Sequence, residues 1–141
     1  MKNTIKLSVK PDLSEIADEC EKLETSLTHA GIGASPAMKV RYIAHEFFVN
    51  VVRHGKMDKE ADNITAEIDI YNNRIELHFV DSGREWLPDQ EVLRQPCHYN
   101  SDDELYAPSG KGLRLIGAMC RTYSMFRDNG RNYTSISVEL K

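Results

Sequence analysis

Apolar and polar residues alternate in several short stretches, and this period of two predicts β-strands. The first stretch, residues 4–10, places Ile5, Leu7 and Val9 on one side and ends at Pro11. A further strand is expected over residues 123–127. The other alternating sets are Ile64, Ala66, Ile68 and Ile70; Ile75, Leu77 and Phe79; and Thr134, Ile136, Val138 and Leu140.

Short polar segments between these stretches predict tight turns. Asn72-Asn73 separates the second and third alternating sets and supplies residues that tolerate positive φ. Asp128-Asn129-Gly130 precedes the last set in the same way. We therefore expect two antiparallel hairpins.

Two longer segments have helical periodicity. Asp12 and Glu15 have the spacing of a capping box and open a helix that ends before Gly31. Ser35-Pro36, a cap followed by a first-turn proline, opens a second helix that ends at Gly55. The apolar positions of the first helix are Leu13, Ile16, Cys20, Leu23, Leu27 and Ala30; those of the second are Val40, Ile43, Ala44, Phe47, Phe48, Val51 and Val52.

The second helix carries a polar stripe opposite its apolar arc. At 3.6 residues per turn, Tyr42, Glu46, Asn50 and Arg53 share one narrow face. An ordinary solvated helix face would look the same. A functional interpretation assigns Asn50 as a neutral oxygen ligand for Mg²⁺ and leaves Glu46 to take a proton nearby.

Two glycine-containing elements extend the functional interpretation. Asp81-Ser82-Gly83 follows an alternating stretch, so Asp81 can accept a hydrogen bond from an exocyclic amine such as that of adenine. Gly110-Lys111-Gly112 precedes a helix expected from Gly112 to Arg121, where backbone N–H groups and the helix dipole can hold phosphates. Each element taken alone could equally be a plain turn or connection.

Length and composition indicate one domain over residues 1–141. Residues 84–111 have no sustained period, contain several prolines and suggest a lid, with a short helix possible near residues 90–94. The net charge of −4, from 18 Lys+Arg and 22 Asp+Glu, argues against a dedicated nucleic-acid or membrane binder. No signal peptide or membrane span is evident, so a cytoplasmic location is expected.

Cysteine and histidine residues provide little evidence of another site. Three cysteines with no CxxC spacing fit reduced thiols, and Cys97-His98 alone is too small to predict a metal site. His45 and His54 fit packing or capping roles, while His29 near a helix end fits the dipole.

The order of Glu46-x-x-x-Asn50, Asp81-x-Gly83 and Gly110-x-Gly112-Leu113 resembles the GHKL ATPase superfamily, which includes histidine kinases and gyrase. The stretch EFFVNVVRHG is similar to the asparagine box of bacterial anti-sigma factor serine/threonine kinases. The resemblance covers nearly the whole chain. It implies a Bergerat-type α/β two-layer sandwich, with a mixed, mostly antiparallel sheet, helices on one face and an ATP lid.

The same resemblance implies roles for individual residues. Glu46 would be the general base, Asn50 would bind Mg²⁺, and Asp81 with Gly83 would contact the adenine of ATP. The other residues implied in cofactor binding are Arg53, Ser109, Gly110, Lys111, Gly112 and Leu113.

Two positions depart from the superfamily pattern. Glu85 stands where many members have a second glycine, although an aromatic residue such as Trp86 is familiar in the anti-sigma branch. Pro108 stands near the place of an arginine in some relatives. Lys111 and Arg114 are then alternative contacts for the γ-phosphate.

By resemblance, the chain is expected to phosphorylate an anti-sigma factor antagonist, to bind a sigma factor and to form a homodimer. Two alternatives stay open: a regulatory module that binds ATP without kinase activity, and an ATPase in which Glu46 activates water. A histidine kinase is disfavoured because no phospho-accepting helical hairpin accompanies the domain.

Overall fold

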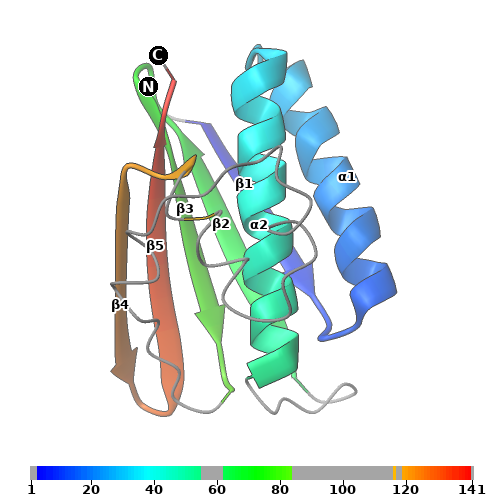
Figure 1. Cartoon of the computed structure of the whole chain (residues 1–141), viewed down its shortest axis with the longest axis vertical. Coiled ribbons are helices and arrows are strands. Elements are labelled where there is room, and N and C mark those ends of the chain that lie inside the picture. The colour runs from blue at the N-terminus through cyan, green and yellow to red at the C-terminus, as the bar shows by residue number, and fades with distance from the viewer. Residues whose placement is uncertain (1–2, 55–61, 84–115, 117–118, 141) are drawn as a thin grey trace, which may run out of the picture.

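The computed structural model describes residues 3–54, 62–83, 116 and 119–140. These residues form a sheet with two long helices on one of its faces (Figure 1). In chain order the elements are β1 (Asn3–Val9), α1 (Leu13–His29), α2 (Ala34–His54), β2 (Ile64–Ile70), β3 (Arg74–Asp81), β4 (Thr122–Asp128) and β5 (Arg131–Glu139). The predicted two-layer α/β architecture is therefore confirmed.

The five-stranded sheet has the strand order β1-β2-β3-β5-β4. It was expected to be mixed and mostly antiparallel, and each pairing among the described strands is antiparallel. The register places Asp81 opposite Asn132, and Asn132 opposite Arg127 on β4. Side chains from three strands therefore meet at one end of the sheet.

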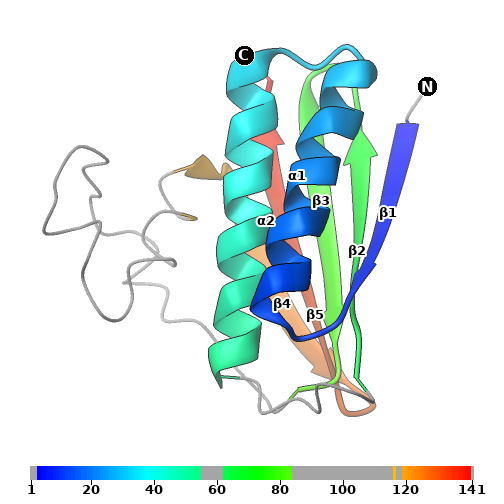
Figure 2. The same cartoon turned by 90° about the vertical axis from the view of Figure 1, so that its right-hand side faces the viewer.

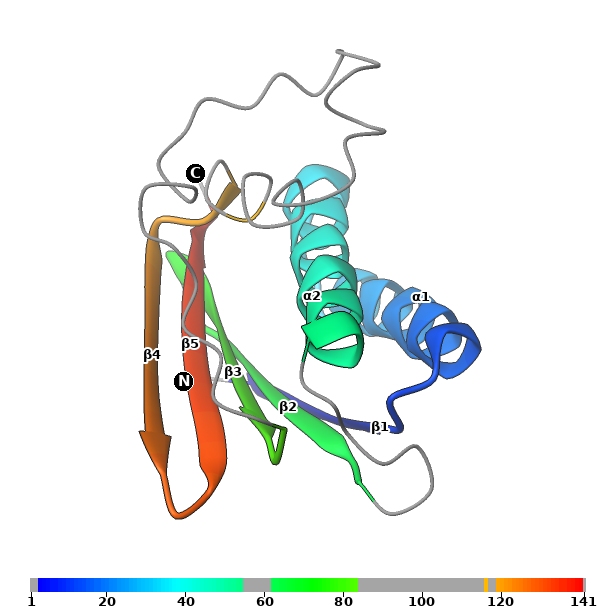
Figure 3. The same ribbon diagram turned by 60° about the horizontal axis from the view of Figure 1, so that its bottom comes forward.

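Both helices cover the same face of the sheet (Figures 2 and 3). α1 contacts α2 and β1, whereas α2 contacts β5. The strand β4 lies at the edge of the sheet farthest from α1 (Figure 3). The two long helices therefore do not cover the part of this sheet face that lies near β4.

An aromatic cluster joins α2 to the sheet. The Phe47 ring stacks on Phe79 with centroids 4.0 Å apart, and Phe48 meets Phe79 edge-on at 5.4 Å. All three side chains are buried. Burying such rings contributes strongly to stability, so the apolar arc predicted for α2 fixes this helix on the sheet.

The helix ends differ slightly from the predicted positions. α2 begins at Ala34, because the carbonyl of Gly33 already accepts the N–H of Ala37 at 3.1 Å. Pro36 is tolerated within this first turn, where backbone N–H groups have no helical partner. The helix predicted to reach Arg121 ends earlier, because the Arg121 N–H donates to the carbonyl of Ser137 at 2.7 Å. Its predicted start at Gly112 lies outside the described residues.

The capping box of α1 is also modified. Asp12 Oδ1 accepts the N–H of Ser14 at 2.9 Å, as expected of an N-cap. Glu15 accepts the N–H of Lys10 at 3.2 Å instead of that of Asp12, which donates to the Lys10 carbonyl. The carboxylate therefore ties the end of β1 to the helix.

Both predicted turns are present, but only one of them uses positive φ. Asn129 and Gly130 have φ of 51° and 74°, as the Asn-Gly hairpin requires. Among the described non-glycine residues, φ is positive only at Asn129, so Asn72 and Asn73 do not use that conformation. The tight turn at Asn72-Asn73 is nevertheless present, because a 2.9 Å hydrogen bond from the Tyr71 N–H to the Arg74 carbonyl encloses these two residues between β2 and β3.

Among the described residues, no helix is long and apolar enough to span a membrane. The expected lid, residues 84–111, and the possible helix near residues 90–94 lie outside the described part of the chain.

Candidate functional site

The polar stripe of α2 contributes the first part of the site. Glu46 and Asn50 lie one helical turn apart, opposite the buried arc of the helix. The Glu46 side chain is 22% exposed, and its Oε1 lies 3.8 Å from His45 Nδ1. This carboxylate is accessible enough to exchange a proton with a bound molecule.

Asn50 contains an unsatisfied polar group. Its Nδ2 atom is buried and makes no hydrogen bond with the residues that the structure describes. Such groups are rare in folded proteins and cost stability unless a ligand or water meets them. Asn50 is therefore suited to hold a polar ligand. Arg53, one turn further along, is exposed.

Asp81 forms the second part of the site, at the end of β3. It is 3% exposed, and its Oδ1 atom accepts hydrogen bonds from Gly83 N–H at 3.0 Å and from Asn132 Nδ2 at 2.9 Å. Burial raises the pKa of Asp81. The hydrogen bonds from Asn132 and Gly83, together with the nearby positive charge of Arg127, offset this rise only in part. Because the second carboxylate oxygen remains an additional acceptor, Asp81 can recognise an amine.

Arg127 fixes the orientation of Asn132. Its Nη1 donates to Asn132 Oδ1 at 2.9 Å and to the Gly83 carbonyl at 3.1 Å. A guanidinium can only donate, so the Asn132 oxygen must face Arg127 and its NH₂ group must face Asp81. The chain of hydrogen bonds Arg127, Asn132, Asp81 thereby sets the direction of the Asp81 carboxylate.

Two buried hydroxyl groups have no hydrogen-bond partner within the described residues. They belong to Thr134, two positions after Asn132 on β5, and to Tyr123 on β4. Burial raises the pKa of Tyr123, and the charges of Cys120 and Asp81 raise it further. Tyr123, Asn132 and Arg127 were not predicted from the sequence as site residues. Thr134 was predicted only as a core position, although a hydroxyl on the inward face of a strand was the available signal.

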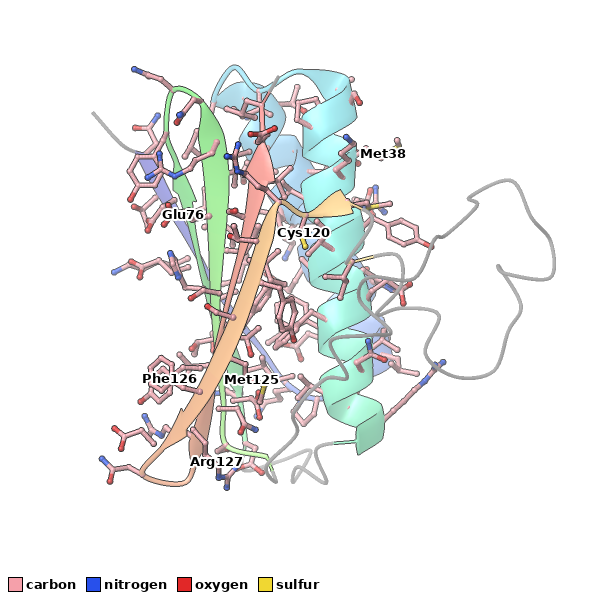
Figure 4. The ribbon with its side chains drawn as sticks, turned by 60° about the vertical axis from the view of Figure 1, so that its left-hand side comes forward. Met38, Glu76, Cys120, Met125, Phe126 and Arg127 are labelled. Carbon is pink, nitrogen blue, oxygen red and sulfur yellow. The ribbon has the colours of Figure 1, made fainter. Side chains whose placement is uncertain are left out.

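These groups share one region of the molecule. The ends of α2 and β3 lie at the same end of the fold (Figures 1 and 2). Figure 4 shows Cys120, Met125 and Arg127 on the helix side of β4, opposite Phe126. The site thus lies on the helix-facing side of the sheet.

The structure gives positions for some of the predicted site residues. Glu46, Asn50 and Arg53 lie on α2, and Asp81 and Gly83 lie at the end of β3. The residues expected to contact phosphates, Ser109 to Leu113, lie outside the described residues, as do Glu85, Trp86, Pro108 and Arg114.

A two-layer domain with this sheet, these covering helices and this helix-side polar site has the fold of the GHKL ATPase domains. The chain belongs to the histidine kinase-like ATPase domain family, whose profile matches residues 9–138. The resemblance drawn from the sequence motifs is thereby confirmed.

Relatives of the chain carry the name serine-protein kinase RsbW. The protein of this name from Listeria innocua is 26% identical over 132 residues, which cover 92% of this chain and 82% of the relative. Its counterpart from Listeria monocytogenes serovar 1/2a is also 26% identical over 132 residues.

A solved structure of a more distant protein has the same fold. The SiaB–SiaC complex from Pseudomonas aeruginosa contains a chain that superposes with a TM-score of 0.58 at 14% identity, covering 96% of this chain and 89% of that chain. At this level of identity the similarity concerns the fold alone.

Proposed function

We propose that the chain is an ATP-dependent serine/threonine-protein kinase that acts as an anti-sigma factor. The observation that carries this proposal is the similarity over 92% of the chain to proteins named serine-protein kinase, within an ATPase domain family. The helix geometry adds support, because Glu46 and Asn50 project from the same face of α2. Residues 1–141 would form one domain, with the lid at about residues 84–111.

The adenine base would bind at Asp81 and Gly83. Asn132 and the Gly83 N–H hold one oxygen of the Asp81 carboxylate, which leaves the other to accept from the exocyclic amine of adenine. Guanine presents a carbonyl oxygen at that position, so the carboxylate would reject it. The buried Thr134 hydroxyl is a further group that such a base, or a water beside it, would satisfy.

The phosphates would contact Arg53 and the glycine turn, with Ser109, Gly110, Lys111, Gly112 and Leu113 as the contributing positions. Asn50 would hold Mg²⁺, since a rotation of its amide turns Oδ1 toward the region that Nδ2 now faces without a partner. When bound, Mg²⁺ would neutralise phosphate charge during transfer.

Glu46 would act as general base. It would take the proton from a serine or threonine hydroxyl of the substrate protein. The hydroxyl oxygen then bonds to the γ-phosphorus while the bond from that phosphorus to the bridging oxygen of ADP breaks. Proton transfer by a positioned carboxylate contributes about 10²–10⁴ in rate.

The substrate would be an anti-sigma factor antagonist, and the chain would also bind a sigma factor as a homodimer. The similarity to proteins named serine-protein kinase RsbW and the anti-sigma resemblance of EFFVNVVRHG support this part of the proposal.

A phosphotransfer assay tests the proposal. Purified protein is given Mg·ATP labelled in the γ-phosphate together with the antagonist that co-purifies with it, and phosphoserine or phosphothreonine is measured. Glu46→Gln should keep ATP binding and lose about 10²-fold or more of the transfer rate. Glu21→Gln, at an exposed position of α1, is the matched control and should keep the full rate.

Other outcomes would identify a different activity. Release of inorganic phosphate without protein phosphorylation would identify an ATPase in which Glu46 activates water. Binding of ATP with neither reaction would identify a regulatory module. Undiminished transfer by Glu46→Gln would reject Glu46 as the base.

A further inference from the structure

The sheet face opposite the helices carries a cluster of three potential metal ligands. Asp69 on β2 and Glu76 and His78 on β3 each offer one ligand atom, and these three atoms lie within 4.8 Å of one another. Figure 4 shows Glu76 on the side of the sheet away from α2. The cluster is therefore separate from the site that contains Asp81 and Asn50.

The strand register forces the two carboxylates together. Asp69 and Glu76 are directly opposite each other in the β2–β3 pair. Like charges at facing positions destabilise an antiparallel pair, and Asp69 is only 5% exposed. Arg74 compensates the Glu76 charge through a 2.7 Å contact, and a metal ion held between the two carboxylates would offset their mutual repulsion.

Each potential ligand is held from behind by a neighbouring side chain. The Thr4 hydroxyl donates to Asp69 Oδ1 at 2.8 Å, and Arg74 Nε donates to Glu76 Oε2 at 2.7 Å. The third ligand, His78, has its Nδ1 atom 2.9 Å from the Ser135 hydroxyl. Outer contacts of this kind orient metal ligands in known sites.

The two distances from His78 to the carboxylates are close to the ligand spacing around one ion. His78 Nε2 lies 3.3 Å from Glu76 Oε1 and 3.6 Å from Asp69 Oδ2. A tetrahedral site with metal–ligand bonds of about 2.0–2.1 Å separates its ligands by about 3.3–3.4 Å. A surface hollow of about 340 Å³ has Glu76, His78 and Ser135 in its wall and gives water access to Glu76 and His78.

We propose that Asp69, Glu76 and His78 form a Zn²⁺ site with one water molecule as the fourth ligand. A nitrogen ligand and a coordination number of four suit Zn²⁺, whereas Mg²⁺ requires near-octahedral oxygen coordination. The ion would connect β2 to β3 on the open face. This inference does not depend on the proposed kinase activity.

Calorimetric titration of the full chain with ZnCl₂ in buffer containing excess Mg²⁺ tests the site. The wild-type protein should bind one Zn²⁺ at this site, and His78→Gln and Asp69→Asn should each weaken that binding more than about 100-fold. His78 is 36% exposed, so its substitution tests the site without disturbing the core. Ser135→Ala, which removes the contact behind the imidazole, should weaken binding about 10-fold.

His29→Gln is the matched control, because it removes an exposed histidine of α1 far from the cluster in the chain. It should bind Zn²⁺ as the wild-type protein does. Titration with Co²⁺ supplies a second measurement, since nitrogen and oxygen ligands give tetrahedral d–d bands without the intense charge-transfer band of thiolate ligands.

Two results would overturn the proposal. In the first, Zn²⁺ binds to His78→Gln and Asp69→Asn as tightly as to the wild-type protein, or it binds to none of the three proteins. The cluster would then be only an ion-pair network. In the second, Co²⁺ shows the thiolate band alone, which would place the bound metal at cysteine residues.

Discussion

Asn132→Ala tests whether the hydrogen-bond chain from Arg127 to Asp81 stabilises the fold. The side chain is 1% exposed and takes part in two hydrogen bonds of 2.9 Å, one to a carboxylate and one from a guanidinium. Hydrogen bonds to charged groups contribute about 1.5–3 kcal/mol each. In the variant, Asp81 and Arg127 each keep a hydrogen bond with the backbone of Gly83, which reduces the expected loss. We expect a loss of about 2–4 kcal/mol in the free energy of unfolding at pH 7.

The loss should depend on pH with a definite sign. The Asn132 hydrogen bond lowers the pKa of Asp81, so its removal raises that pKa further. The destabilisation is then complete where Asp81 is ionised and shrinks as the pH falls through the pKa that Asp81 has in the variant. Urea unfolding at about pH 7 and at about pH 3 measures both limits.

Asp81→Asn supplies the control for this reasoning. Burial raises the pKa of Asp81, so the folded state keeps that proton to higher pH than the unfolded state does, and ionisation costs stability as the pH rises. Relative to the wild-type protein, Asp81→Asn should therefore gain stability between about pH 3 and pH 7. The double variant with Asn132→Ala should reveal a coupling of at least about 1 kcal/mol. A pH-independent loss for Asn132→Ala, or no coupling, would refute the assignment.

Three further predictions concern stability and reactivity. Phe79→Ala should lower the free energy of unfolding in urea by about 3–5 kcal/mol, because Phe79 contacts both aromatic rings of α2. Phe126→Ala, at a position that is 60% exposed, should lower it by less than about 1.5 kcal/mol, and equal losses would contradict the assigned core. Gly130→Ala should lower stability by about 1–2 kcal/mol, since φ is 74° and no atom lies near the added Cβ; an unchanged unfolding midpoint would disprove the strained turn. Cys20 should resist alkylation in the native protein, because burial raises the pKa of its thiol to about 12, and peptide mapping that finds Cys20 modified at the rate of a free thiol would contradict this.

The periodicity of the sequence predicted the elements that bury apolar residues. A strand was predicted from the alternation of Ile64, Ala66, Ile68 and Ile70, and a tight hairpin turn was predicted from Asn129-Gly130. The structure confirms both. Helix starts were less predictable. The first helical hydrogen bond of α2 is accepted by the Gly33 carbonyl, so the helix begins before the expected cap at Ser35. The exact start depends on local backbone geometry, which the preference of a residue type for cap positions does not determine.

Polar contacts between strands could not be predicted from the sequence alone. Asn132 and Asp81 are far apart in the chain and meet only because β5 pairs with β3 in one register. Asp69, Glu76 and His78 likewise become neighbours through strand pairing. A sequence pattern identifies which face of a strand is apolar, but the partner of each polar side chain depends on register.

The register of β5 also predicts where the chain will accept insertions and deletions. Asn132 and Thr134 face the helices, whereas Ser135 faces the other side of the sheet beside His78. Inserting or deleting one residue inside β5 would exchange the faces of these side chains and damage both sides of the sheet together. A library of single-residue insertions should therefore retain function at the β4–β5 hairpin tip and lose it along residues 132–138.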